Sequence, residues 1–236
     1  MRHLLAFALF LLGFSVTAHA DPGEYLIVSG GPALRKWEDL RRNGEQHDRF
    51  WGNFIRTARA RIEELQKQQP GINITWLVYQ DSYARRDVED KRSVTALVQS
   101  VRDKYKVKLV WFHTGDDVIN YINGGANRWH TKVSGFEYFG HSNKFCFMFD
   151  YSSDVYGVST SWLHQRDLRK IHSSAFAPNA YCQSWGCHTG EAMSTEWKKA
   201  TGIWMIGASG KTDYTDLELH NNHPHIGDGA HWKMKG

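Results

Sequence analysis

Two residues whose types suit nucleophilic chemistry follow apolar runs of the chain. His141 comes directly after the run 133–140, and Cys187 comes shortly after the run 179–185. A thiol that is deprotonated by an imidazole attacks carbonyl carbon, and the imidazolium then protonates the leaving group. The pair therefore predicts acyl-transfer chemistry, with Cys187 as nucleophile and His141 as general base and acid.

The residues around Cys187 favour the same role. A helical pattern over 191–200 follows it, and the N–H groups at a helix N-terminus stabilise a thiolate and an oxyanion. Gly186 and Gly190 permit a sharp turn and a close approach by substrate. His188 is adjacent in sequence and is a rival base. Other candidates for a supporting role are Gly140, His113, Asp213 and Asp216.

The chain has three cysteines, which are Cys146, Cys182 and Cys187. One disulfide among them leaves one thiol over. A Cys146–Cys182 bond fits two neighbouring strands and leaves Cys187 free, whereas a Cys182–Cys187 bond has to close a small loop. Alternatively, Cys146 and Cys182 are buried free thiols. A disulfide at Cys187 would remove the nucleophile.

The first twenty residues have the pattern of a secretory signal peptide. Arg2 gives a basic start, 4–16 is apolar, and Ala18-His19-Ala20 precedes Asp21. We expect cleavage after Ala20 and export to a periplasm or to the outside. The apolar run is too short to span a membrane comfortably, so no membrane insertion is expected after cleavage.

Apolar runs alternate with helical patterns over residues 21–236. This alternation predicts a single α/β domain with a mostly parallel sheet and helices on both faces. The expected strands are 24–29, 72–79, 108–113, 133–140, 144–150, 179–185 and 203–208. The expected helices are 48–69, 93–105, 116–122, 163–175 and 191–200. From about residue 219 the chain is rich in His, Asn and Gly, and we expect it to be loosely ordered.

These elements have to bring His141 and Cys187 together. In such sheets the functional crevice lies beyond the carboxyl ends of the strands. A right-handed crossover through one helix would make the strands 133–140 and 179–185 parallel neighbours. Both side chains would then emerge at the same edge of the sheet.

Two short motifs carry a resemblance to a known group of enzymes. They are FEYFGH at 136–141 and YCQSWGCHTG at 181–190. An apolar strand ending in His, a crossover and a second strand ending in Cys resemble the caspase, gingipain, legumain and clostripain clan of cysteine peptidases (clan CD).

The resemblance implies a caspase-like three-layer sandwich and a peptidase with a Cys187–His141 dyad. It also implies an oxyanion hole made by the N–H groups of Cys187 and Ser142, and no cofactor. The chain departs from the clan at two positions: Ser142 stands where Gly is usual, and Gly186 stands where Ala or Ser is frequent.

Two other functions remain open on sequence alone. The C-terminal stretch offers imidazoles for zinc or copper, which would make a metal-dependent hydrolase, although the spacing matches no standard zinc pattern. The residues concerned are His220, His223, His225 and His231, with Asp228. The second alternative is a non-catalytic exported binding domain on the same fold.

Composition and motifs exclude several further classes. The net charge of +4 is small, and basic residues alternate with acidic ones, which argues against nucleic-acid binding. No Gly-x-Ser-x-Gly elbow, P-loop or dinucleotide fingerprint occurs. The expected partner is the one that the resemblance to cysteine peptidases implies, a peptide or protein substrate.

Overall fold

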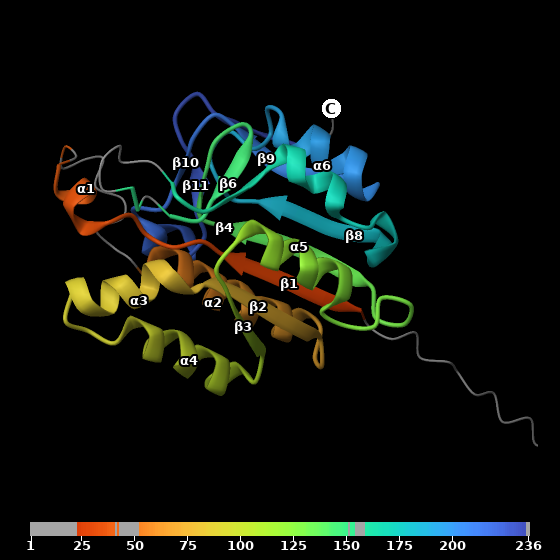
Figure 1. Ribbon diagram of the computed structural model, residues 1–236, viewed down its shortest axis with the longest axis horizontal. Coiled ribbons are helices and arrows are strands. Elements are labelled where there is room, and N and C mark those ends of the chain that lie inside the picture. Colours follow the sequence, from red (N-terminus) through yellow and green to blue (C-terminus); the bar gives the residue numbers. More distant parts are fainter. Residues whose placement is uncertain (1–22, 41, 43–51, 151, 154–158, 235–236) are drawn as a thin grey trace, which may run out of the picture.

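A computed structural model describes residues 23–40, 42, 52–150, 152–153 and 159–234 (Figure 1). Its centre is a seven-stranded sheet in the order β12-β9-β8-β4-β1-β2-β3. Its strands are β1 (Glu24–Ser29), β2 (Asn73–Tyr79), β3 (Lys108–Phe112), β4 (Val133–Phe139), β8 (Phe176–Ser184), β9 (Met205–Ser209) and β12 (His231–Lys233). All pairs are parallel except β12 with β9. The predicted α/β class is confirmed, and the predicted leader 1–20 lies outside the described residues.

Helices cover both faces of this sheet and make a three-layer sandwich. The helices are α1 (Arg35–Asp39), α2 (Asn53–Gln68), α3 (Gln80–Glu89), α4 (Val94–Tyr105), α5 (Gly115–Gly124) and α6 (Met193–Thr201). α2 and α4 pack on one face, where Ile27 and Trp76 are fully buried. α5 and α6 pack on the other face, where alternate residues of the same strands, such as Leu26 and Phe136, are fully buried. This alternation is what a strand buried on both faces requires.

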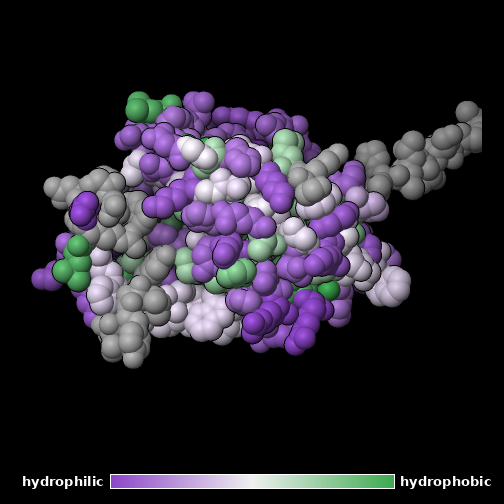
Figure 2. Space-filling view, turned by 90° about the horizontal axis from the view of Figure 1, so that it is seen from above, coloured by the Kyte–Doolittle hydropathy of each residue, from purple (hydrophilic) through white to green (hydrophobic). Residues whose placement is uncertain are grey.

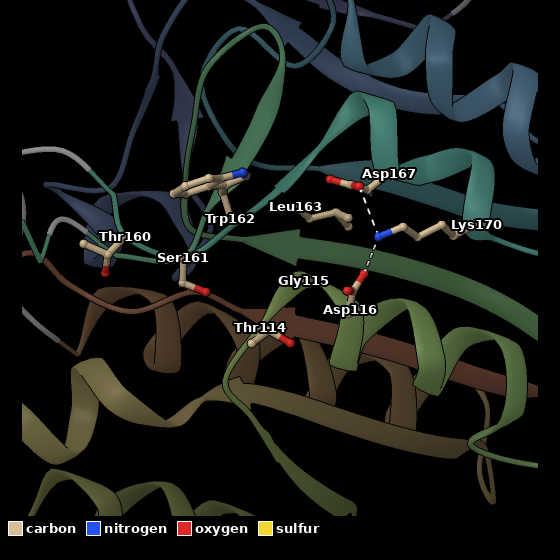
Figure 3. Close-up of a pocket in the computed structure, with 9 residues that line it drawn as sticks. All are labelled: Thr114, Gly115, Asp116, Thr160, Ser161, Trp162, Leu163, Asp167 and Lys170. Atoms are coloured by element: carbon tan, nitrogen blue, oxygen red, sulfur yellow. Dashed lines mark hydrogen bonds and ion pairs between the residues drawn. The ribbon is translucent and has the colours of Figure 1, made fainter.

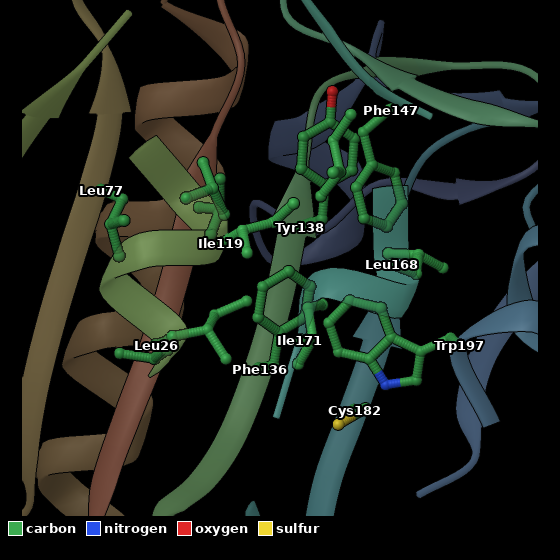
Figure 4. Packing of buried hydrophobic residues seen from close by; sticks show 14 of the residues in the cluster. Leu26, Leu77, Ile119, Phe136, Tyr138, Phe147, Leu168, Ile171, Cys182 and Trp197 are labelled. Atoms are coloured by element: carbon green, nitrogen blue, oxygen red, sulfur yellow. The ribbon is translucent and has the colours of Figure 1, made fainter. Parts of the chain in front are cut away.

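Large aromatic side chains fill the layer under α6 (Figure 4). Trp197 of α6 is fully buried, and its ring centroid lies 4.5 Å from that of Phe136 on β4. Tyr138 stacks on Phe147 with centroids 4.2 Å apart. Because Phe136 and Tyr138 point to one face, the residue between them, Glu137, points to the other.

The connection between β4 and β8 differs from the prediction. A three-stranded antiparallel sheet occupies its first half, made of β5 (His141–Ser142), β6 (Cys146–Met148) and β7 (Trp162–His164). The expected strand 144–150 is β6 and lies outside the central sheet. The expected helix 163–175 is wrong. That segment contains β7 and two 3-10 helices, η3 (Gln165–Lys170) and η4 (Ser173–Ala175), in which the only apolar residues, Leu168 and Ala175, are both buried.

The C-terminal stretch is more regular than expected. It contains η5 (Leu217–His220) and β11 (His225–Ile226), which pairs with β10 (Thr212–Asp213), before β12 joins the edge of the central sheet. Backbone pairing orders this polar segment, although its composition offers few apolar residues to bury.

The face seen in Figure 2 is largely hydrophilic, with hydrophobic residues scattered over it. The most exposed large hydrophobic side chains include Leu40, Val88 and Trp129. None of the helices in the described part of the chain combines the length and apolar character that crossing a bilayer requires.

Candidate active site

The predicted nucleophile and base follow two strands that lie side by side. β4 and β8 pair in parallel with Tyr138 opposite Ser184, and the Trp185 N–H donates to the Tyr138 carbonyl at 2.9 Å. The predicted adjacency of these strands is confirmed. His141 and Cys187 therefore lie on the two loops that leave the sheet at the same edge.

These two loops contact each other through Ser142. Its hydroxyl donates to the Cys187 carbonyl at 2.7 Å. A Cβ on Gly186 would lie 2.1 Å from the Ser142 Oγ, so only glycine permits this approach. A Cβ on Gly140 would lie 3.3 Å from the Gly30 Cα, so glycine also lets the loop after β4 cross close to the loop after β1. Gly186 and Gly140 thus allow the backbones to meet.

The thiol of Cys187 is partly exposed and faces Thr212 of β10. The Thr212 N–H donates to Sγ at 3.4 Å, and the Thr212 hydroxyl lies 3.5 Å from it. The thiol in turn donates to the Thr212 carbonyl, which lies 3.6 Å from Sγ. The thiol is therefore held in place by a segment that sequence reasoning did not connect with it.

The expected helix N-terminus at Cys187 is displaced. Residues 187–192 form turns, and α6 begins only at Met193. The N–H groups of His188 and Gly190 donate to the carbonyls of Gly210, just after β9, and of Ala208, within β9. Because those donors are used within the fold, they do not point at a substrate as the N-terminus of a helix would.

The backbone N–H of Ser142 is not used in the pairing of β5 with β6. In the β5–β6 hairpin the Asn143 N–H donates to the Cys146 carbonyl at 3.0 Å. Ser142, the residue before Asn143, pairs with Phe147 of β6. Bonded and non-bonded pairs alternate in an antiparallel ladder, so the Ser142 N–H points away from β6.

The imidazole of His141 is nearly buried, with a relative exposure of 9%. Its ring packs edge-on against Phe54 of α2 with centroids 5.1 Å apart. Phe54 packs in the same manner on Tyr214, at 4.9 Å. The His141 ring is thus supported by Phe54 rather than surrounded by solvent.

His188 is engaged with Glu191. Its Nδ1 lies 2.6 Å from the Glu191 Oε1, and its backbone has a φ of 61°, in the left-handed region. The contact with His188 is the main reason why the pKa of Glu191 lies below its usual value, and the Gly210 N–H contributes as well. This geometry makes His188 part of the turn after Cys187.

His113 lies at a different place on the molecule. It follows β3, the edge strand, and β1 and β2 separate β3 from β4. Its Nδ1 lies 2.8 Å from Asp81, and its carbonyl accepts from the Ser161 hydroxyl. Of the two roles open to His113, support of the site or packing, its place after β3 favours the second, since parallel strands carry their ends to the same edge but not to the same point on it.

Next to His113 lies a polar pocket of about 250 Å³ (Figure 3). Lys170 lies between two carboxylates of this pocket, 2.8 Å from Asp116 and 3.2 Å from Asp167. Trp162 forms part of the rim and is about half exposed. The ion pairs satisfy the charges of this pocket internally.

The C-terminal histidines do not form a metal site. Within the described residues no group of three or more His, Cys, Asp or Glu side chains is placed to bind a metal. His223 pairs with Glu64 through Nε2 at 2.6 Å, and the rings of His220 and His225 stack 4.1 Å apart. His231 lies in β12.

All three cysteines are free thiols. Cys146 lies in β6 opposite His164, whereas Cys182 lies in β8 between β4 and β9, so the expected neighbouring strands are not neighbours. Burial raises the pKa of the Cys182 thiol to about 12 and also raises that of Cys146. The buried-thiol alternative therefore describes Cys182, whereas Cys146 is a free thiol that is only partly buried.

Sequence reasoning missed three residues that shape the site: Thr212, Tyr214 and Phe54. Asp213 was singled out instead, but its carboxylate accepts from the backbone and hydroxyl of Thr215 and forms a local turn. The signal for Thr212 and Tyr214 is their alternation with Asp213 directly after the β9 region, which places both on one side of an extended segment.

No family model, curated protein or solved structure matches the chain. The resemblance to caspase-like peptidases accordingly stays an expectation based on two motifs and the order of the strands. The function has to be argued from the site itself.

Proposed function

We propose that this chain is an exported cysteine hydrolase that cleaves peptide or other amide bonds, with Cys187 as nucleophile and His141 as general base and acid. The observation that carries the proposal is the contact between the two loops at one edge of the sheet, where Ser142 donates to the Cys187 carbonyl at 2.7 Å. A free thiol and an imidazole on touching loops are the minimum that acyl transfer needs.

The reaction has two halves. The Cys187 sulfur attacks the carbonyl carbon, its proton passes to His141, and the C–N bond breaks as the imidazolium protonates the leaving amine. Water then attacks the thioester carbon, with His141 taking its proton, and the C–S bond breaks to release the acid and restore the thiol. No metal or cofactor takes part.

Negative charge develops on the carbonyl oxygen in both halves. The N–H groups of Cys187 and Ser142 are the proposed donors to this oxygen. The direction of the Ser142 N–H, away from β6, supports that role. Two donors fixed by the backbone need little rearrangement as the charge appears.

The test uses two variants and two probes, a synthetic peptide library read by mass spectrometry and iodoacetamide as a thiol reagent. We expect Cys187→Ala and His141→Ala to abolish peptide cleavage, a loss of at least about 10³-fold. Cys187→Ala should also remove the alkylated site. Cys146→Ala is the matched control and should keep full activity, because that thiol lies in the β6 hairpin.

Three outcomes would count against the proposal. Full activity in Cys187→Ala would exclude this nucleophile. Loss of wild-type activity with a chelator, restored by zinc, would favour the metal-dependent hydrolase. An unreactive Cys187 in a protein that binds peptides without cleaving them would favour the non-catalytic binding domain.

A further inference from the structure

The buried hydroxyl of Tyr214 joins the two loops that carry the proposed dyad. It donates to the Trp185 carbonyl at 3.1 Å, in the loop that leads to Cys187. It accepts the N–H of Gly140, the residue before His141. A phenol is one donor and also an acceptor, so a single oxygen can serve both loops.

The ring of Tyr214 reaches the imidazole through one intermediate. Phe54 packs edge-on against Tyr214 at 4.9 Å and against His141 at 5.1 Å. Asn53, the first residue of α2, donates from its side chain to the Tyr214 carbonyl at 2.7 Å. The start of α2 is thereby tied to the same tyrosine, which fixes Phe54 between the two rings.

The C-terminal segment that carries Tyr214 also contacts the nucleophile. Thr212 donates to the Cys187 sulfur, and its hydroxyl donates to the same Trp185 carbonyl at 2.8 Å. Thr212 and Tyr214 thus lie on the same side of an extended segment, and both donate to the Trp185 carbonyl. The loop before Cys187 cannot shift without breaking both bonds.

We propose that Tyr214 is a positioning residue that holds the Cys187 loop, the His141 loop and, through Phe54, the His141 ring in one fixed arrangement. This inference rests on the proposed function, because it assumes that Cys187 and His141 act together. Burial, with the nearby Cys187 as a further cause, raises the pKa of Tyr214 well above its ordinary value, so the phenol keeps its proton.

The test compares Tyr214→Phe with Tyr83→Phe. Tyr83 is equally buried, and its hydroxyl donates to the Gly30 carbonyl at 2.8 Å, after the neighbouring strand β1. Both variants lose one buried phenol bond to a carbonyl, but the Tyr214 bond is to the loop that leads to Cys187, whereas the Tyr83 bond is to the loop after β1. The readouts are the rate of iodoacetamide alkylation at Cys187 across pH, followed by mass spectrometry, and thermal unfolding.

We expect Tyr214→Phe to slow alkylation near neutral pH about tenfold, since displacement of a paired base lowers the fraction of reactive thiolate. Its pH profile should move toward that of His141→Ala. Tyr83→Phe should keep the wild-type profile, although both variants unfold at a lower temperature. A structural role alone would lower the unfolding temperature without moving the profile.

The outcomes separate this inference from the proposed function. Equal profiles for Tyr214→Phe and Tyr83→Phe would overturn the positioning role while leaving the dyad intact. An unchanged profile in His141→Ala would overturn the proposed function itself. If Tyr214→Phe does not fold, Phe54→Leu decides: a shift toward the His141→Ala profile supports the inference, and a wild-type profile overturns it.

Discussion

Two buried glutamates occupy the central sheet, one on each face, and each is held by one arginine and by hydroxyl or indole donors. Glu24 begins β1 and pairs with Arg128 at 2.6 Å, and Thr75 and Tyr121 donate hydroxyl protons to it. Glu137 lies within β4 and pairs with Arg61 at 2.5 Å. It also accepts from the Tyr25 hydroxyl and, at 2.7 Å, from the Trp185 indole.

The two networks differ in what they hold. Arg128 is nearly buried, and its other bonds go to carbonyls of Tyr121, Ile122 and Thr131, all at the edge of the sheet opposite the site. The Glu137 network instead reaches Trp185, two residues before Cys187. The Glu24 network therefore stabilises the fold alone, whereas the Glu137 network links the fold to the loop that leads to the proposed nucleophile.

Removing the arginine from the Glu24 network should give the largest loss of stability. Arg128→Met leaves a buried carboxylate without its counter-charge, and we expect a decrease of about 3–5 kcal/mol in the free energy of unfolding. Urea denaturation followed by tryptophan fluorescence measures it. The folded fraction should still alkylate at Cys187 at the wild-type rate, because no member of this network touches the site.

Lys170→Met is the control for Arg128→Met. Lys170 pairs with two carboxylates, but all three side chains are exposed, so no measurable change in stability is expected. The purely structural role of the Glu24 network would be contradicted if Arg128→Met proves no more destabilising than Lys170→Met. It would also be contradicted if Arg128→Met slows alkylation of Cys187 in the folded protein.

Neutralising each glutamate in turn tests whether the two networks differ in their effect on Cys187. Glu137→Gln and Glu24→Gln keep the shape of the side chain and lose the charge, and we expect each to cost about 2 kcal/mol. Arg61 keeps a second partner, Glu64 at 3.3 Å, which moderates the loss at Glu137. Only Glu137→Gln should also slow alkylation of Cys187. Equal alkylation rates in the two variants would show that the networks do not differ in function.

Lowering the pH should remove the contribution of Glu24 to the free energy of unfolding. Burial alone would raise the pKa of Glu24, but the bonds from Thr75, Tyr121 and Arg128, with the charge of Arg128, outweigh it and hold the pKa below its ordinary value. The carboxylate therefore stabilises the fold above about pH 4.3, its unfolded value, and this contribution is lost as the pH falls toward the folded-state pKa. The stability gap between wild type and Glu24→Gln should narrow over that range.

Neither network is visible in the sequence, although the strands that hold them are. β1 was predicted with its observed bounds, and the C-terminal ends of β4 and β8 were placed within one residue, because apolar runs mark buried parallel strands. Glu137 interrupts such a run, and its partner Tyr25 lies 112 residues away. A single sequence does not reveal which remote side chains meet a buried charge.

The missed elements have local reasons. α3 carries only Tyr83 and Val88 as large apolar residues among polar ones, so no helical stripe is present. The 163–175 region contains Leu163, Leu168 and Ile171 at spacings compatible with a helix, but the β6–β7 pairing takes its first residues. The contact between the His141 and Cys187 loops was predictable because it follows from strand order, whereas the role of Tyr214 depends on how the C-terminal segment turns back.

The smallest effect should come from the indole that joins Glu137 to the site loop. Trp185→Phe removes the N–H bond to Glu137 and keeps an aromatic ring to stack on Phe139, whose centroid lies 5.9 Å away. We expect a loss of about 1 kcal/mol and a two- to threefold slower alkylation of Cys187. Urea denaturation and site-resolved alkylation measure the two effects.

Trp76→Phe is the matched control for Trp185→Phe. Trp76 is fully buried, and its indole donates to the Ser29 hydroxyl at 2.9 Å. It should lose a similar amount of stability with no change in alkylation, since its bond ties β2 to β1 and not to the loop before Cys187. A slower alkylation in both variants would mean that any loosened indole contact reaches the thiol. The Glu137 network would then hold no special position relative to the rest of the core.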